Sequence, residues 1–148
     1  MAIKQISIKT KFGWISAYEN RGKIFKIKFG KLNKQKKSKI LEIFKTRLLD
    51  SFKKKTQIRI PYKLEGNKIQ NKVWGELKKI KFGQTKSYGE IAKKYKLSPR
   101  HVGKICGQNQ IILAIPCHRV IKSDGSLGGF SSIGGVNTKK KLLNFEKY

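Results

Sequence analysis

Apolar and polar residues alternate in the first thirty positions with the two-residue period of a β-strand. The alternation predicts three strands, near residues 6–8, 14–18 and 25–29, with Arg21-Gly22 as a hairpin turn between the last two. In the third strand, lysines alternate with the apolar residues of one predicted face, Phe25, Ile27 and Phe29. The chain is therefore predicted to open with a small, half-buried sheet.

The period then changes to that of a helix. Ser38 is a candidate N-cap, and apolar residues follow it at helical spacing: Leu41, Phe44, Leu48 and Phe52. Residues 58–62 are predicted to be a last short strand, with Pro61 marking an edge or an end. Residues 1–62 thus form a predicted α/β domain, and residues 63–68 a linker.

A second domain, residues 69–148, is predicted to be mainly helical. One helix face runs from Ile69 to Ile80, and Ser87 to Glu90 form a capping box that opens the next helix. A further helix runs from the N-cap Ser98 to Gly107 and has proline at its first position.

The last two of these helices, joined by a tight turn, fit a helix-turn-helix. The outward face of the second carries Arg100, Gly103 and Lys104, with His101 beside them. Under a functional interpretation it contacts DNA, and Gly103 permits a close approach of the backbone. An ordinary two-helix corner fits the same pattern, and the pattern alone does not separate the two.

The charge of the chain favours a polyanionic partner. Its 148 residues include 36 Lys+Arg and 8 Asp+Glu, a formal net charge of +28, which suits nucleic acid first and an anionic membrane surface second. However, 31 of the basic residues are lysines spread over the whole chain, a bias that an AT-rich genome also produces. Charge therefore supports nucleic-acid binding without locating it, and on charge alone a ribosome- or RNA-associated protein is a third hypothesis.

The two cysteines, Cys106 and Cys117, are expected to be free thiols. The N-terminus has no secretory pattern, and the longest apolar run, Ile111 to Pro116, is too short to span a bilayer. We expect an intracellular, cytoplasmic protein (nuclear in a eukaryote) without a membrane partner.

Cys117 has the neighbours of a reactive thiol. A cysteine attacks as thiolate, and His118 and Arg119 follow it directly. Consecutive side chains on an extended backbone point to opposite sides, so a water molecule would have to bridge thiol and imidazole. The residues themselves leave three acceptors open for orienting His118, namely Glu146, Asp124 and Glu90.

Other interpretations of Cys117 compete with this one. A lone cysteine is most often a small buried residue. A metal site with His118, Cys106 or His101 matches no zinc spacing, and a cysteine protease would have a distant histidine. Asn109, between the second helix and Cys117, could fix a turn, and the glycine-rich stretch 125–135 could line a pocket or form a long hairpin turn.

Together these residues resemble the O6-alkylguanine-DNA alkyltransferases, also called methylated-DNA–protein-cysteine methyltransferases. Pro116-Cys117-His118-Arg119-Val120 is similar to the active-site signature of that family. Further motifs match in order over residues 69 to 146, about half the chain: Gln70-Asn71-Lys72-Val73-Trp74, Gly83, Ser87-Tyr88-Gly89-Glu90-Ile91-Ala92, Arg100-His101-Val102-Gly103, Asn109, Gly125, Gly128-Gly129-Phe130-Ser131, Gly134-Gly135, Lys139, Leu142-Leu143 and Glu146. The first half matches more loosely.

The resemblance implies an α+β or α/β fold class. An N-terminal RNase H-like α/β domain would precede a mainly helical domain with a winged helix-turn-helix. Its second helix would enter the DNA minor groove, and the damaged guanine would be flipped into a pocket. Arg100 would fill the vacated stack, and the DNA-binding surface would also include Tyr88, Gly103, Lys104 and Arg119.

The resemblance also implies the catalytic roles. Cys117 would take the alkyl group, with His118 as its base through a water and Glu146 orienting the imidazole. Tyr88 would contact the guanine and help to protonate it, and Asn109 would be the hinge between recognition helix and active site. The substrate pocket would include Val120, Phe130, Ser131 and Gly134.

The implied activity is irreversible DNA repair, the transfer of a methyl or larger alkyl group from O6-alkylguanine, with O4-alkylthymine as a second candidate substrate. A thioether product has no easy hydrolysis route, so we expect one turnover per molecule and no cofactor. We expect no metal, a monomer, and duplex DNA carrying the lesion as the partner. A non-catalytic winged-helix DNA-binding protein, with Cys117 as a structural thiol, is the competing hypothesis.

Three residues depart from the family pattern. Phe130 stands where tyrosine is common, Gln110 stands where proline is common after Asn109, and Ile69 replaces a usual aromatic residue. None of them removes a group that the chemistry requires.

Overall fold

The computed structural model describes residues 3–129 and 135–147. The chain divides into two compact units, one of residues 1–64 with 110–114 and one of residues 65–109 with 115–148. The sequence predicted one continuous domain over 69–148, so the place of residues 110–114 differs from the prediction. The reason lies in the backbone and in burial: Ile27 donates its N–H to the carbonyl of Gln110 at 2.8 Å, and the apolar run after Gln110 is buried.

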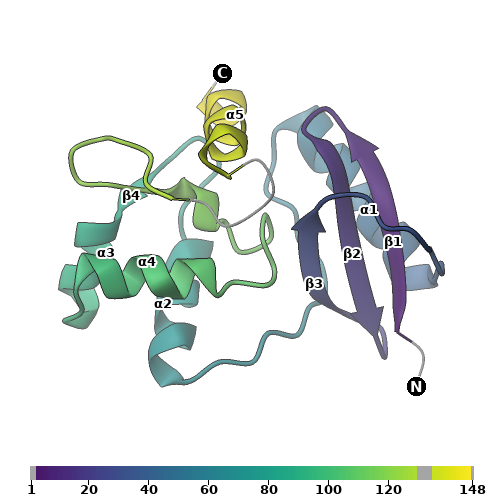
Figure 1. The fold of residues 1–148 in the computed structure, drawn as a ribbon, viewed down its shortest axis with the longest axis horizontal. Helices are drawn as coiled ribbons and strands as arrows, with labels where there is room; N and C mark the ends of the chain where they lie inside the picture. Colours follow the sequence, from purple (N-terminus) through teal and green to yellow (C-terminus); the bar gives the residue numbers. More distant parts are fainter. Residues whose placement is uncertain (1–2, 130–134, 148) are drawn as a thin grey trace. The chain divides into compact units, whose positions relative to one another are not determined.

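The first unit is an antiparallel sheet with a helix on one face (Figure 1). Strands β1 (Lys4–Thr10), β2 (Gly13–Asn20) and β3 (Lys23–Phe29) lie in the order β1-β2-β3, and helix α1 (Lys39–Lys54) covers their inner face. The apolar side chains of that face and of α1 form the core, since burying apolar area is the main stabilising term. The three predicted strands and the helix, with its Ser38 cap, are confirmed.

The predicted strand at residues 58–62 is wrong. Within this stretch only Tyr62 pairs with the sheet, through an isolated bridge to Ile24. Pro61 has no N–H to donate, although its carbonyl accepts from Ile24 at 3.1 Å. The stretch therefore follows the edge of β3 without becoming a strand.

A β-bulge in β3 reverses the predicted side of Phe25. Tyr18 pairs with Lys26 and Glu19 with Ile24, so Phe25 is the extra residue. Its ring is partly exposed and lies 6.0 Å from that of Tyr18, centroid to centroid, on the outer face of the sheet. The prediction that placed Phe25 with Ile27 and Phe29 on the buried face is wrong for Phe25, because a period-two pattern does not reveal an inserted residue.

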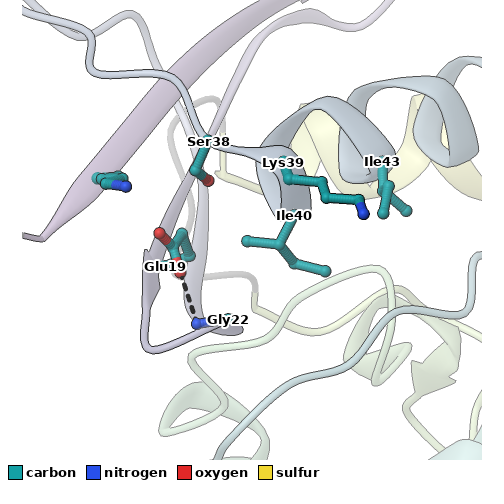
Figure 2. A pocket seen from close by; sticks show the side chains of 7 residues that line it. Glu19, Gly22, Ser38, Lys39, Ile40 and Ile43 are labelled. Atoms are coloured by element: carbon teal, nitrogen blue, oxygen red, sulfur yellow. Dashed lines mark hydrogen bonds between the residues drawn. The ribbon is translucent and has the colours of Figure 1, made fainter.

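The β2–β3 hairpin is closed by a tight turn with an acidic anchor. Arg21 and Gly22 have φ of 52° and 79°, the left-handed backbone that two-residue hairpins prefer. The buried carboxylate of Glu19 accepts from the N–H of Gly22 at 2.9 Å, as the dashed line in Figure 2 shows. Glu19 also lines a cavity of about 340 Å³, with walls that include Ile40 and Ile43 of α1.

The second unit is mainly helical. Helices α2 (Lys68–Lys78), α3 (Tyr88–Tyr95) and α4 (Pro99–Gly107) are followed by a 3₁₀ turn, η1 (Cys117–Arg119), and by helix α5 (Gly135–Lys147). Two short strands, β4 (Lys86–Ser87) and β5 (Val120–Ile121), pair in parallel. The unit therefore brings η1, β5 and α5 beside the helices that precede them in sequence (Figure 1).

The predicted caps of α3 and α4 are present. The Ser87 hydroxyl accepts from the N–H of Glu90 at 3.0 Å, and the Glu90 carboxylate accepts from the N–H of Ser87 at 3.0 Å. Ser98 caps α4 through the N–H of His101 at 3.1 Å. These bonds satisfy N–H groups that the first turn of a helix leaves without partners.

A buried carboxylate joins α2 to the elements that follow it. Glu76 is 2% exposed and accepts from Lys94 at 2.6 Å, from Lys79 at 2.9 Å, from Lys86 at 3.3 Å and from the Tyr95 hydroxyl at 2.8 Å. Burial raises the pKa of Glu76, but hydrogen bonds from Lys94, Lys79, Tyr95 and Lys86 outweigh it and hold the pKa well below its usual 4.5.

Replacing Glu76→Gln is expected to lower the free energy of unfolding by about 2 kcal/mol at pH 7, because hydrogen bonds to a charged acceptor are lost in a buried place. The pKa of Glu76 is depressed on folding, so its contribution is complete above about pH 5 and is lost as the pH falls below 4.5. Urea denaturation at several pH values should show the difference between wild type and variant shrinking in acid. The exposed Glu42→Gln is the control, at about 0.5 kcal/mol. A pH-independent difference would contradict the assignment.

Candidate active site

Cys117 begins η1 and is 7% exposed. Its N–H donates to the carbonyl of Ile115 at 2.8 Å, and Arg119 donates its N–H to Pro116 at 3.0 Å. The extended backbone expected from the sequence is therefore wrong at this point, since residues 117–119 form a 3₁₀ turn. The turn fixes the directions of Cys117 and His118 within one short, hydrogen-bonded segment.

Asn109 connects the end of α4 with the turn that carries the thiol. Its side chain is 5% exposed and donates to the carbonyl of Ile115 at 2.8 Å, and it is also hydrogen-bonded to the Cys117 thiol. The Asn109 side chain thus binds both the backbone before Cys117 and the Cys117 thiol. It lies between α4 and η1, where the family resemblance implied a hinge.

A buried carboxylate lies behind His118. Glu146, on α5, accepts from His118 Nε2 at 2.7 Å, and both side chains are nearly inaccessible to solvent. Of the three acceptors that the sequence left open, the structure brings Glu146 to His118. Asp124 is exposed and accepts from Ser126, and the Glu90 carboxylate is engaged in its capping box.

Arg119 shares that carboxylate. Its Nε donates to Glu146 Oε1 at 2.7 Å, one terminal nitrogen donates to Glu146 Oε2 at 3.0 Å, and the other donates to the carbonyl of Ile80 at 2.9 Å. The guanidinium also lies 5.2 Å from the ring centre of Phe82, and the residue is 2% exposed. The assignment of Arg119 to the DNA-binding surface is therefore wrong, because its donors face the interior of the unit.

Lys139 is a buried residue of the site for which the sequence suggested no role. It lies on α5 and its ammonium donates to the carbonyl of Val120 at 2.6 Å, to the Tyr88 hydroxyl at 3.2 Å and to the carbonyl of Gly129 at 3.3 Å. The sequence held a usable signal, because Lys139 lies three residues before Leu142 on the buried face of a helix.

Tyr88 lies between the glycine-rich stretch and α4. An added Cβ on Gly128 would stand 2.9 Å from the Tyr88 ring, and Gly128 has φ of +74°, so glycine is required there. A Cβ added at Gly103 would lie 3.7 Å from the same ring, an ordinary contact distance. Backbone from two segments thus holds the ring in place.

The electrostatic balance of the site favours a protonated thiol at rest. Burial raises the pKa of Cys117, while the hydrogen bond from Asn109 and the charge of Lys139 lower it in part. Burial lowers the pKa of His118, against the opposing effect of Glu146, so the imidazole is neutral at pH 7. Burial also raises the pKa of Tyr88 to about 12.

Glu146 is ionised throughout the physiological range. Burial alone would raise the pKa of its carboxyl, but hydrogen bonds from His118 and Arg119 lower it to about 2. The site therefore combines a thiol, a neutral imidazole and a carboxylate. Such a set can accept the proton of a thiol and stabilise the imidazolium that results.

The predicted DNA-contacting residues Arg100 and Lys104 are exposed on α4. A cavity of about 280 Å³ opens beside them, lined by Tyr88, Pro99, Arg100, Gly103, Lys122 and Ser123. Lys122 and Ser123, which follow β5, were not predicted to line this cavity. Their place just before the glycine-rich stretch was the sequence signal that could have indicated it.

The remaining predictions concern four pocket residues and metal binding. Val120 is fully buried, and its carbonyl binds Lys139. Phe130, Ser131 and Gly134 lie outside the described residues. Over residues 3–129 and 135–147, no three His, Cys, Asp or Glu side chains gather as metal ligands would.

The second unit combines a buried thiol, an imidazole–carboxylate pair that begins at the next residue and an exposed basic helix, a combination that suits a class of protein with cysteine chemistry beside a polyanion-binding helix. Residues 68–148 match the family model described as "6-O-methylguanine DNA methyltransferase, DNA binding domain". The match covers more than half of the chain, and the chain belongs to this family.

The chain is also similar to curated methylated-DNA–protein-cysteine methyltransferases. The chain is 49% identical over 88 residues to the methylated-DNA–protein-cysteine methyltransferase of Methanocaldococcus vulcanius, covering 60% of this chain and 53% of the relative. It is 43% identical over 108 residues to that of Methanocaldococcus jannaschii, 73% of this chain and 61% of the relative. The chain thus spans about half to three fifths of the length of these relatives.

Solved structures match over nearly the whole chain. The crystal structure of Mycobacterium tuberculosis OGT in complex with DNA has a TM-score of 0.85 at 29% identity and covers 97% of this chain and 92% of its own. An O6-methylguanine DNA methyltransferase from Methanococcus jannaschii has a TM-score of 0.68 at 30% identity, covering 96% and 93%. The mixed α/β fold is therefore that of these proteins. None of the helices among the described residues has the length and apolar character needed to cross a bilayer.

Arg119→Met is expected to destabilise the protein by about 3–5 kcal/mol, because it leaves the buried Glu146 carboxylate without its guanidinium. Denaturant unfolding at pH 7 measures the loss. Arg100→Met, on the exposed face of α4, is the matched control and should change the free energy of unfolding by no more than about 0.5 kcal/mol. Equal effects of the two substitutions would contradict the buried ion pair.

His118 is expected to hold its proton on Nε2 and to become doubly protonated only as the pH falls below 6.5, because burial lowers its pKa. Long-range ¹H–¹⁵N correlation spectra recorded across a pH titration report both the tautomer and the midpoint. The spectrum of a His101→Gln variant assigns the His118 signals. A midpoint above 6.5 would show that the charge of Glu146 outweighs burial.

Proposed function

We propose that this protein repairs DNA directly, by transferring the alkyl group of an O6-alkylguanine in duplex DNA to Cys117. The observation that carries the proposal is the buried, hydrogen-bonded pair of His118 and Glu146, in which His118 follows Cys117 within the same 3₁₀ turn. A structural cysteine has no need of a buried proton acceptor with a buried carboxylate behind it, whereas a nucleophile does. Membership of the methyltransferase family supports the same reaction.

We assign the first unit to an RNase H-like domain and the second to a winged helix-turn-helix. In this assignment α3 and α4 are the two helices of the motif, and β4 with β5 begins the wing. Helix α4 would enter the minor groove, with Arg100 and Lys104 toward the duplex. Gly103 would let the backbone approach, and Arg100 would take the place of the extruded base.

The flipped guanine would meet the side chains that surround the thiol. Enzymes that modify a base must take it out of the stack before they can reach its atoms. Tyr88, fixed between Gly103 and Gly128, lies beside the cavity next to Arg100 and would contact the guanine. Ser131 and Phe130 are proposed as further pocket residues on the strength of the family pattern.

The proposed reaction is an in-line displacement at the alkyl carbon. The Cys117 proton passes through a water to Nδ1 of His118, which is the accepting nitrogen because Nε2–H donates to Glu146. The thiolate forms the S–C bond as the C–O6 bond breaks, and that electron pair goes to the guanine. Tyr88 protonates the departing guanine, and Lys139 stabilises the tyrosinate oxygen that results. The proton held by His118 then passes through water to Tyr88, so that only Cys117 is left changed.

The product is a thioether on a buried cysteine, with guanine restored in the DNA. Among the described residues of the site, no group is positioned to cleave a thioether, so each molecule would act once, without a cofactor. Transfer from O4-alkylthymine would follow the same chemistry if the smaller base fits. The protein would act as a monomer. Because its substrate is DNA, it would act in the cytoplasm or, in a eukaryote, in the nucleus.

Incubation with a duplex containing O6-methylguanine is expected to add one methyl group to Cys117, with stoichiometric loss of the lesion. Intact-mass analysis followed by peptide mapping measures both. Cys117→Ser should abolish transfer and retain duplex binding, while Cys106→Ser, the matched control, should still be methylated because it leaves Cys117 and the His118–Glu146 pair unchanged. Duplex binding with no mass change in the wild type would favour the non-catalytic winged-helix protein.

A further inference from the structure

The outer face of the β-sheet in the first unit carries aromatic rings among lysines. Because side chains alternate along a strand, Trp14 and Tyr18 of β2 point away from the face that buries Ile15 and Ala17. The bulge in β3 adds Phe25 to the same outer face. The three rings are partly exposed, although rings of this size are more often buried.

The rings form two separate groups on this face, the pair Tyr18 and Phe25 and the single ring of Trp14. Tyr18 and Phe25 lie 6.0 Å apart, centroid to centroid, and Trp14 lies four residues from Tyr18, about 13 Å along the strand at about 3.3 Å per residue. The segment that leaves β3 crosses the sheet between them, because Leu32 donates its N–H to the Ser7 hydroxyl at 2.7 Å and Ser16 donates to the carbonyl of Gly30 (Figure 1).

Lysines lie beside both groups of rings. Lys31 lies 4.8 Å from the ring centre of Trp14, and Lys28 lies 5.6 Å from that of Tyr18. By register, Lys9 pairs with Trp14 and Lys26 with Tyr18, so both are on the same face. The three strands contain one acidic residue, Glu19, and it is buried on the inner face with its carboxylate bound to Gly22.

We propose that this face, Lys9, Trp14, Tyr18, Phe25, Lys26, Lys28 and Lys31, binds single-stranded DNA. Exposed aromatic rings on a sheet stack on unpaired bases, and ammonium groups between them neutralise phosphates. A duplex keeps its base faces covered, so it would use the lysines but not the rings. The face is therefore suited to a single strand more than to the duplex engaged by α4.

Deoxyribose suits this face better than ribose. Recognition of RNA uses side chains that bond to the 2′-hydroxyl. The two serines of the face are already engaged, since Ser7 and Ser16 lie 2.8 Å apart, oxygen to oxygen, and each also bonds to the crossing segment. Gln5 donates to the carbonyl of Lys34 at 3.4 Å. Besides the Tyr18 hydroxyl, what the face offers is ring surface and positive charge.

The inference goes beyond the proposed function and does not rest on it. The residues lie in the first unit, outside the segment that matches the methyltransferase DNA-binding domain. A protein that repairs a base in duplex DNA would gain from a second contact with unpaired DNA, since both contacts raise its local concentration at the same molecule.

The test uses the full chain and a fluorescein-labelled dT₂₀ oligonucleotide at about 0.15 M salt, where surface charges are screened beyond about 8 Å. Anisotropy should show that Tyr18→Leu with Phe25→Leu weakens binding by about fivefold or more, because two stacking rings are lost. The same double variant should bind a duplex as the wild type does and should retain methyl transfer to Cys117. Lys26→Gln with Lys28→Gln should weaken binding more than the control pair Lys53→Gln with Lys54→Gln, which removes the same charge from α1.

Tryptophan emission supplies a local measurement. Trp74 is 4% exposed and hydrogen-bonded to the carbonyl of Ile105, so quenching by dT₂₀ should come from Trp14 and should disappear in Trp14→Phe. Unchanged affinity of the Tyr18/Phe25 variant, equal losses for single strand and duplex, or quenching that survives Trp14→Phe would each overturn the proposal. Tighter binding of rU₂₀ than of dT₂₀ would overturn its assignment to DNA. None of these outcomes depends on whether Cys117 is methylated.

Discussion

The second unit depends on one buried carboxylate, that of Glu146, whose two oxygens are shared between two hydrogen-bonding partners. Glu146 accepts from His118 and from two nitrogens of the Arg119 guanidinium, whose third nitrogen donates to the carbonyl of Ile80 after α2. A buried charge is costly unless it is fully paired. With the guanidinium present, the negative charge is compensated without a proton on the imidazole. Without it, His118 would be drawn toward the imidazolium form and could no longer accept a proton. The same contact therefore joins α5 to η1 and keeps His118 neutral, the state that the proposed mechanism requires of its base.

The thiol is held in a balance of opposing effects. Burial favours the protonated form of Cys117, whereas Asn109 and the charge of Lys139 favour the thiolate. A thiol that is protonated at rest reacts slowly with oxidants and with stray electrophiles, because the thiolate is the reactive species. Under the proposed mechanism, activation requires both a proton acceptor for the thiol and an electrophilic carbon within reach of the sulfur. Lys139 also bonds to the Tyr88 hydroxyl, whose pKa burial raises to about 12.

Local signals in the sequence predicted the local structure well. The capping residues Ser38, Ser87 and Ser98 were correctly identified because each helix start is decided by a few adjacent residues. Long-range features were not predictable in the same way. The bulge at Phe25 depends on the pairing of β3 with β2, and the inward direction of Arg119 depends on Glu146, 27 residues away. In the site, a charged residue on a buried helix face, Lys139, was a signal that periodicity could have supplied.

Residues 110–114 give the chain an interlaced construction. Ile111, Ile112 and Leu113 are buried in the first unit, yet they lie in sequence between Asn109 and Cys117 of the second. A fragment that begins at residue 65 would keep every residue of the candidate active site but would expose these three side chains to water, and apolar side chains without a core promote association. The first unit thus also buries a short segment that interrupts the sequence of the second unit. Evolutionary exchange or deletion of the first unit at the boundary near residue 64 would therefore also have to supply new burial for Ile111, Ile112 and Leu113.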